Sequence, residues 1–198
     1  MLEAAELDCE RGGRVLFRKL GFSAKGGELV RIAGPNGSGK TSLLRILCGL
    51  LTPAAGEVRW QGTPIRSLKE EYSRQLVYLG HAPAVKDELT AGENLAATCA
   101  LAGLGPAGIE DAVARFGVPL DKPVKQLSQG QRRRAALARL VLSPQVPLWL
   151  LDEPLTALDT AAADLTKELM RQHVARGGAI AYTTHQDAGL RDSRVLEL

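Results

Sequence analysis

The chain has 198 residues, of which 45% are hydrophobic and 24% are charged. This length and composition allow a sizeable buried core in one domain, which excludes fibrous, disordered and mini-protein classes. Lys and Arg total 25 against 22 Asp and Glu, and the largest basic run has only three residues, so nucleic acid is not expected among the partners.

Neither export nor a membrane span is expected. Acidic residues occur within the first ten positions, where a signal peptide would carry positive charge. The longest uncharged stretch, residues 95–109, contains three glycines and a proline and is shorter than the ~20 apolar residues of a membrane helix. Cys9, Cys48 and Cys99 are odd in number and lack metal-ligand spacing, which indicates reduced thiols in a cytosolic protein. If the protein acts at a membrane, another subunit must span it.

In chain order, alternating residues near the N-terminus predict short strands at 2–8, 15–17 and 22–24, and an apolar run predicts a buried strand at 28–33. A helix is expected over 41–50, followed by strands over 56–61 and 75–79. Thr90 and Glu93 have capping-box spacing ahead of an Ala-rich helix, and a second helix is expected over 109–116. Residues 83–135 are therefore predicted to form a mostly helical insert.

Beyond the insert, a strand is expected over 148–151, a helix over 161–175 and a strand over 179–183. Strands interleaved with helices predict an α/β fold with a parallel sheet. The core of the domain is then expected at about 1–82 and 136–198.

A phosphate-binding pattern follows the buried strand and precedes the first helix. It consists of Gly34, Pro35, Asn36, Gly37, Ser38, Gly39, Lys40 and Thr41. The glycines let successive N–H groups point at one anion, Lys40 would reach the β- and γ-phosphates, and Thr41 would hold Mg²⁺. Ser42 could bind a neighbouring phosphate oxygen. The alternative is a glycine-rich turn without chemistry, and the pattern alone does not separate kinase, GTPase, helicase and transporter ATPase.

Asp152 and Glu153 follow the apolar strand at 148–151, at the edge where parallel sheets bind ligands. Asp152 suits the Mg²⁺ shell, and Glu153 could orient and partly deprotonate the water that attacks the γ-phosphate. An ordinary pair of loop acids would be the more probable interpretation without Lys40 upstream.

The segment Leu127-Ser128-Gln129-Gly130-Gln131 precedes a predicted helix. Ser128 and Gln131 have capping-box spacing. A helix N-terminus with a serine hydroxyl and an unhindered glycine backbone also suits a second phosphate contact. The two interpretations are compatible.

At this point the chain resembles the nucleotide-binding domain of ATP-binding cassette (ABC) proteins along nearly its whole length. The resemblance uses the phosphate loop, the signature 127–131, the acidic strand end, the D-loop-like segment ending at Asp159, and His185 after a strand. It implies a P-loop NTPase core with an N-terminal antiparallel β subdomain and a helical insert that carries the signature. It also implies a head-to-tail homodimer with two bound ATP molecules. Each ATP would lie between the phosphate loop of one copy and Ser128, Gly130 and Gln131 of the other. His185 would contact the γ-phosphate, and Asp159 would face the partner.

Within this family, the chain looks like the ATP-binding subunits of bacterial cytochrome c maturation haem exporters. The features are its small size and four segments, residues 60–62, 80–83, 127–134 and 183–186. This likeness implies integral membrane partners and a peripheral location on the cytoplasmic face of the inner membrane. Alternatives are an exporter of another substrate, a chromosome-maintenance ATPase and a small-molecule phosphotransferase. The segment between Lys40 and Leu127 is too short for the long coiled coil of the chromosome-maintenance class, and the signature disfavours the phosphotransferase.

Three positions depart from the family pattern. Gln129 stands where the signature usually has glycine, and it could crowd the sandwiched phosphate or add a hydrogen bond. His81 aligns with the glutamine that the family normally offers to Mg²⁺ and to the membrane subunit. Arg11 aligns with the aromatic residue that normally stacks on adenine, and its guanidinium could stack instead.

Other residues are expected to serve the fold. His173 is predicted on the solvated surface of its helix, and Trp60, Trp149 and Cys99 are predicted to pack. The run 132–134 is expected to form a solvated helix face, or to contact acidic headgroups or a partner.

Overall fold

The computed structural model describes residues 1–103, 105–184, 189–190 and 193–198. The N-terminal region forms an antiparallel sheet with the order β2-β1-β4-β5. Its strands are β1 (Leu2–Arg11), β2 (Arg14–Ala24), β4 (Ala55–Trp60) and β5 (Thr63–Pro64). Gly12 and Gly13, both with positive φ, make the tight turn between β1 and β2.

The strands at 15–17 and 22–24 were expected to be separate, whereas β2 is continuous. Glu6 and Lys19 have positive φ, and the β1–β2 register shifts at three points. Such bulges break the alternation of polar and apolar residues while the pairing continues, so sequence alternation alone divided one strand into two.

The second sheet is parallel and has the order β6-β7-β8-β3-β9. Its strands are β6 (Leu76–Leu79), β7 (Leu148–Leu151), β8 (Ala179–Thr183), β3 (Leu29–Ala33) and β9 (Arg194–Glu197). Four of them match predicted strands within one residue. The edge strand β9 was missed because it is short and mostly exposed, so it lacks an apolar run.

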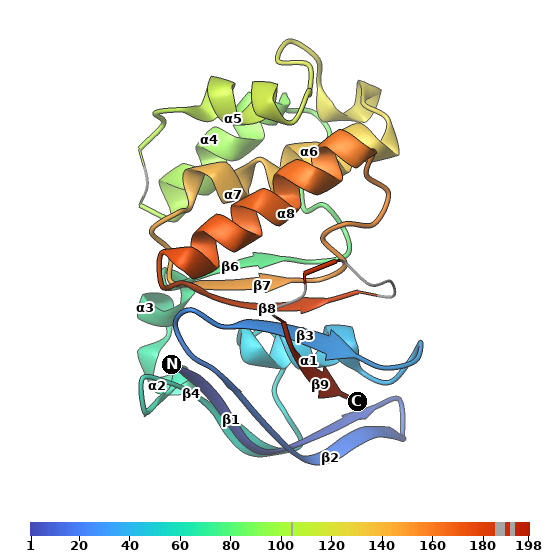
Figure 1. Ribbon diagram of the computed structural model, residues 1–198, viewed down its shortest axis with the longest axis vertical. Helices are drawn as coiled ribbons and strands as arrows, with labels where there is room; N and C mark the ends of the chain where they lie inside the picture. Colours follow the sequence, from blue (N-terminus) through green and yellow to red (C-terminus); the bar gives the residue numbers. More distant parts are fainter. Residues whose placement is uncertain (104, 185–188, 191–192) are drawn as a thin grey trace.

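Helix α1 (Lys40–Leu47) lies between the two sheets, and α8 (Thr160–Ala175) covers the opposite face of the parallel sheet (Figure 1). Two short helices, α2 (Ile65–Leu68) and α3 (Glu70–Ser73), precede β6. The helical insert stands on the α8 side and contains α4 (Ala91–Leu101), α5 (Ile109–Arg115), a 3₁₀ turn (Val124–Gln126) and most of α6 (Gln129–Leu137). Helix α7 (Arg139–Leu142) follows it. The Thr90–Glu93 capping box at the start of α4 is confirmed.

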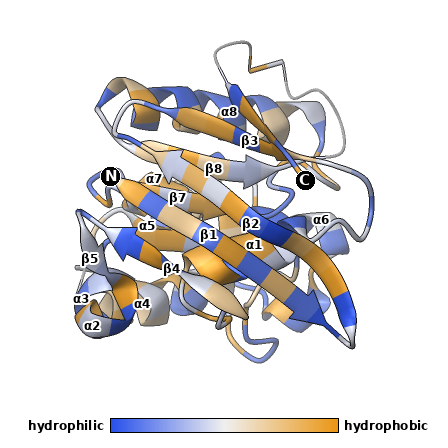
Figure 2. Cartoon of the chain, turned by 90° about the horizontal axis from the view of Figure 1, so that it is seen from below, coloured by the Kyte–Doolittle hydropathy of each residue, from blue (hydrophilic) through white to orange (hydrophobic). Residues whose placement is uncertain are grey.

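The inner strands β7 and β8 of the parallel sheet are buried on both faces, which explains their apolar sequences. Along β7, Leu148 and Leu150 pack with α1 and the antiparallel sheet. Trp149 and Leu151 pack with α8 and the insert. Seen from below, the outer sheet instead shows hydrophilic and hydrophobic residues mixed along β1 and β2 (Figure 2).

His173 was expected on the surface, but its side chain is 1% exposed. Its ring stacks on Trp149 with centroids 3.9 Å apart and planes 12° from parallel. The reason is helical spacing: His173 continues the buried face formed by Ala162, Thr166, Leu169 and Met170. A side chain at Gly178 would collide with this ring, so glycine there makes room for it.

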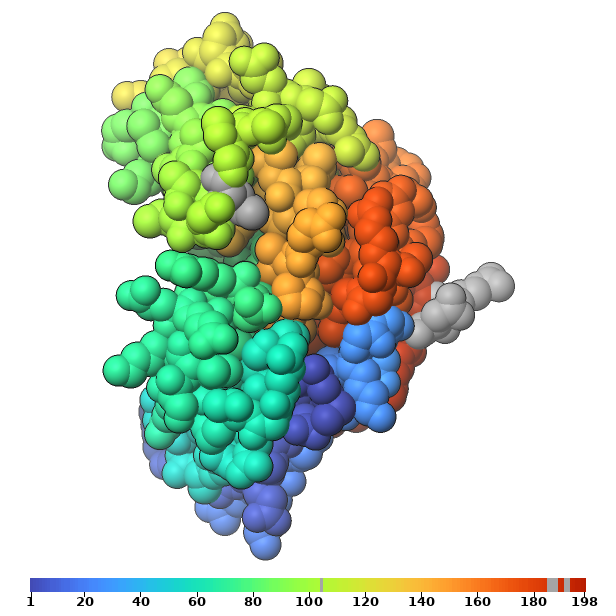
Figure 3. Space-filling model, turned by 90° about the vertical axis from the view of Figure 1, so that its left-hand side faces the viewer, coloured from blue at the N-terminus to red at the C-terminus, as the bar shows by residue number. Residues whose placement is uncertain are grey.

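Within the described residues, no helix has both the length and the apolar character needed to cross a membrane. In the space-filling view, the green and yellow insert stands above the teal α2–α3 segment, and the surface is indented between them (Figure 3).

Candidate functional site

The phosphate loop joins the carboxyl end of β3 to the N-terminus of α1, as predicted. Gly37 and Gly39 have φ of 81° and 108°, a conformation that strains other residues. Lys40 lies under the loop with its side chain 7% exposed, and its Nζ donates to Gly34 O at 2.8 Å and Pro35 O at 2.9 Å. Two of its three ammonium protons thus hold the loop curled, which leaves the third for an anion.

Ser38 shows that the loop is shaped for a further polar group. Its Oγ is buried and has no hydrogen-bond partner among the described residues. A side chain at Gly34 would collide with this oxygen. A buried hydroxyl without a partner is costly in a folded protein, so the loop fits an anion that accepts its proton.

Asp152, which follows β7, accepts hydrogen bonds from a residue of α1 and from a residue of β8. Its carboxylate is 1% exposed and accepts from Thr41 Oγ1 at 2.9 Å and from Thr183 Oγ1 at 2.7 Å. A hydroxyl and a carboxylate in contact are hard oxygen ligands of the kind that Mg²⁺ prefers. The structure therefore brings together Thr41 and Asp152, two of the three residues predicted for the metal, and the third, His81, lines the same cavity.

Glu153 has an unusual backbone conformation. Its φ is 53°, which is sparsely populated for residues other than glycine. Its N–H donates to Thr183 Oγ1 at 2.9 Å, and its Oε2 accepts from Thr156 Oγ1 at 3.0 Å. Strained conformations persist at functional sites where the surroundings hold them. Thr183, at the end of β8, thus anchors both acids, a role that sequence reasoning missed. Its only sequence signal is a hydroxyl ending an apolar strand.

These side chains surround one cavity of about 500 Å³. Its lining includes phosphate-loop residues together with Arg11, Leu16, Ser42, His81, Asp152, Glu153 and Thr156. Arg11 and His81 are both exposed. The structure thus places the predicted Arg11, Ser42 and His81 beside the phosphate loop. His185 lies outside the described residues.

The signature residues do not line this cavity. Ser128 caps α6: its Oγ accepts from Gln131 N at 3.2 Å, and Gln131 Oε1 accepts from Ser128 N at 2.9 Å. The predicted capping box is confirmed, and it occupies the Gln131 side chain. Ser128 is exposed, and Gly130 lies beside the Ala157 backbone. Asp159 caps α8 and pairs with Arg134 at 3.0 Å.

The prediction of a solvated face for the run 132–134 is wrong at Arg133, whose side chain is 6% exposed. Its guanidinium donates to the carbonyls of Gly80 (2.7 Å), His81 (3.2 Å), Asp152 (2.7 Å) and Glu153 (2.8 Å). Burial lowers the pKa of Arg133 from its ordinary value, and the Asp152 and Glu153 carboxylates oppose that shift. The burial of Arg133 was not predicted because the side chains of a basic run usually point to solvent.

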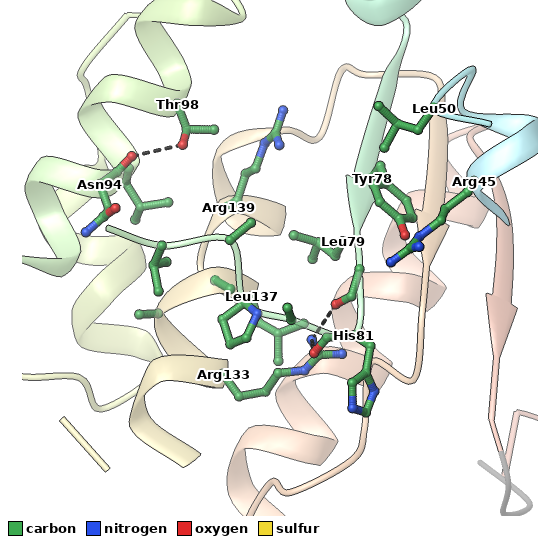
Figure 4. Close-up of a pocket in the computed structure, with 18 residues that line it drawn as sticks. Arg45, Leu50, Tyr78, Leu79, His81, Asn94, Thr98, Arg133, Leu137 and Arg139 are labelled. Carbon is green, nitrogen blue, oxygen red and sulfur yellow. Dashed lines mark hydrogen bonds between the residues drawn. The ribbon is translucent and has the colours of Figure 1, made fainter. Parts of the chain in front are cut away.

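A groove of about 370 Å³ lies at the junction of the insert and the core (Figure 4). Asn94 and Thr98 of α4 form one wall, and Arg45 and Leu50, at the end of α1, lie opposite. Leu50 is 69% exposed. Among the described residues, neither Arg45 nor Arg139 forms an ion pair, and burial lowers the pKa of Arg139. His81 lines both this groove and the cavity.

The sequence pattern of the ABC transporter family matches residues 17–156, which include the phosphate loop, the signature helix and both acids. The chain belongs to the ABC transporter family. As a member it is a nucleotide-binding, ATP-hydrolysing transporter subunit.

Relatives of this ABC subunit share most of its length. The cytochrome c biogenesis ATP-binding export protein CcmA of Aromatoleum aromaticum is 55% identical over 193 residues, covering 95% of this chain and 90% of the relative. CcmA of Escherichia coli K12 is 47% identical over 205 residues, covering 98% and 94%. A solved ATP-binding subunit of an ABC transporter is 27% identical, with a TM-score of 0.89 over 100% of this chain and 85% of that one. The expected α/β fold of ABC type is thereby confirmed.

Proposed function

We propose that this ABC subunit hydrolyses Mg²⁺-ATP to drive an export complex for cytochrome c maturation, with haem as the cargo. The observation that carries the catalytic part is the chain of contacts Thr41–Asp152–Thr183–Glu153 facing the phosphate loop. The names of the relatives support the biological system.

Lys40 and the loop N–H groups are proposed to bind the β- and γ-phosphates. The buried Ser38 hydroxyl would donate a hydrogen bond to a phosphate oxygen. Thr41 and Asp152 would hold Mg²⁺, with His81 at the margin of its shell. When bound there, the metal would supply positive charge to the phosphates. Ser42 would contact a neighbouring phosphate oxygen, and Arg11, at the cavity wall, would stack on the base.

Glu153 is proposed as the residue that orients and partly deprotonates the attacking water. Its carboxylate lines the cavity and is 8% exposed, so a water held there is largely shielded from solvent. Thr156 donates to one of its oxygens, which fixes the rotation of the carboxylate. His185 is proposed to contact the γ-phosphate from the segment after β8.

A homodimer completes the site in this proposal. Ser128 and Gly130 lie outside the nucleotide cavity of their own chain, and Ser128 is exposed. The N-terminus of α6 would therefore bind the ATP of a second copy, where its partial positive charge favours the phosphates. Gln131 would act through the cap of that helix, and Asp159 would face the partner.

The membrane subunits are proposed to dock in the groove beside His81. An exposed leucine supplies apolar contact, and two arginines that form no ion pair within the described part of the chain favour a segment with carboxylates. Such docking would place the chain peripherally on the cytoplasmic face of the inner membrane.

The proposal is tested by deleting the gene in its host and measuring covalent haem in c-type cytochromes by haem staining. We expect loss of c-type cytochromes and recovery with the wild-type chain but not with Lys40→Ala. Normal cytochromes in the deletion strain, together with ATPase activity in the purified chain, would identify an exporter of another substrate.

A further inference from the structure

Arg133 is the point where the signature helix touches the hydrolytic edge of the same chain. It lies on α6, which begins next to Ser128, and it contacts the carboxyl ends of β6 and β7. All four of its acceptors are main-chain carbonyls, in two pairs that lie on neighbouring strand ends. Figure 4 shows the Arg133 guanidinium reaching the chain segment between Leu79 and His81.

The Glu153 backbone depends on this contact. A positive φ at a glutamate is strained and must be held by its surroundings. One side of the residue is held by the Thr183 hydroxyl, which accepts from its N–H, and the other by Arg133, which donates to its C=O. The Thr156 N–H also donates to the Glu153 C=O, at 3.1 Å, but it belongs to the same turn, so Arg133 is the contact that joins this carbonyl to the signature helix and to the His81 segment.

We propose that Arg133 is a positioning residue for ATP hydrolysis: it fixes the Glu153 main chain and the His81 segment relative to each other and to the signature helix. The inference rests on ATP hydrolysis by this ABC subunit and does not depend on its cargo. Because Ser128 caps α6 and Arg133 lies on the same helix, a movement of the signature helix must move or break the contacts that hold Glu153.

Arginine suits this role and lysine does not. The guanidinium offers five N–H donors in a rigid plane, so two of its nitrogens can bind two pairs of carbonyls at once. A lysine has one nitrogen and cannot reach both strand ends. The change Arg133→Lys therefore keeps the charge and removes the bridge.

Arg132 supplies the matched control. It lies next to Arg133 on α6, and its contacts are to Lys125 O, Leu127 O and the Asp87 carboxylate, all within the insert. The change Arg132→Lys alters an arginine on the same helix without touching either strand end.

The first measurement is amide hydrogen exchange of the full-length chain bound to a non-hydrolysable ATP analogue. The amide of Asp152 donates to Leu79 O at 2.7 Å and that of Glu153 to Thr183 Oγ1, so both report on this edge. We expect Arg133→Lys to speed exchange about tenfold or more in peptides covering 80–82 and 152–154, with the core of α8 unchanged and Arg132→Lys like wild type.

The second measurement separates turnover from nucleotide affinity. Because a misplaced catalytic group can cost about 10²-fold in rate, we expect Arg133→Lys to lower kcat at least tenfold, while the Kd for a fluorescent ATP analogue changes less than about threefold. Unchanged exchange at 152–154 would overturn the proposal. So would faster exchange throughout the molecule or loss of nucleotide binding, since either would show that Arg133 serves folding in general.

Discussion

At the scale of residues, Lys40 illustrates how one side chain shapes and charges the phosphate loop. We predict that Lys40→Ala lowers ATP turnover by about 10²-fold or more, because it removes the cation that stabilises charge developing on the γ-phosphate and the hydrogen bonds to Gly34 and Pro35. Steady-state phosphate release measures this, with Lys25→Ala, an exposed lysine, as control. Activity above roughly a tenth of wild type would contradict the role of Lys40, since such losses are typically larger.

Single residues also show where sequence reasoning stops. Lys40, Thr41 and Asp152 could be found because a motif at a strand end fixes their positions. Arg133 and Thr183 could not, because their role depends on which carbonyls and carboxylates the fold brings to them. The sequence of a basic run does not show whether one guanidinium is buried or all of them point to solvent.

At the scale of elements, the pairing of α8 with β7 places a histidine in the core. Burial lowers the pKa of His173 from 6.5 to about 4, and Arg176 adds to this, while the carbonyls of Pro147 and Ala179 oppose it. The His173 imidazole therefore binds a proton less readily in the folded state than in the unfolded state. The stability from neutral His173 is complete above about pH 6.5 and is lost as the pH falls towards about 4.

We predict that the free energy of unfolding of the wild type falls by about 2 kcal/mol more than that of His173→Gln between about pH 7.5 and pH 5, from this shift. Urea titrations of both proteins at the two pH values measure the difference. Carboxylate titration affects both proteins alike and cancels. Parallel losses would mean that His173 is not the group responsible.

Most elements could be predicted, and the errors share a cause. The strands β3, β7 and β8 are mostly apolar and helix α8 has helical spacing of its apolar residues, so their sequences indicate their burial. The continuous β2, the edge strand β9 and the buried face of α8 at His173 depend on bulges, pairing and packing partners. These arise from contacts distant in sequence, which local patterns do not encode.

At the scale of the whole molecule, the separation of the signature from the nucleotide cavity predicts an ATP-dependent dimer. We expect Glu153→Gln to bind ATP, to lose hydrolysis and to accumulate as a dimer, because the amide keeps the shape of the carboxylate and removes the base. Size-exclusion chromatography in ATP measures this, with ADP as the control. Continued hydrolysis would move the base to another residue.

The groove and the nucleotide cavity meet at His81, so a partner seated in the groove can affect hydrolysis without touching ATP. The cationic wall of the groove gives a direct test. Arg45 is exposed and lies near the Tyr78 hydroxyl, so Arg45→Glu reverses charge at the groove without disturbing the core.

We predict that Arg45→Glu reduces co-purification with the cytochrome c maturation membrane subunits at least tenfold, because like charges would face each other across a docking interface. Binding of a fluorescent ATP analogue should stay within about twofold of wild type, since Arg45 does not line the nucleotide cavity. Arg115→Glu is the matched control, because Arg115 is exposed at the end of α5 and does not line the groove. Equal loss in both variants would indicate an effect of net charge, and equal retention would place the docking surface elsewhere on the molecule.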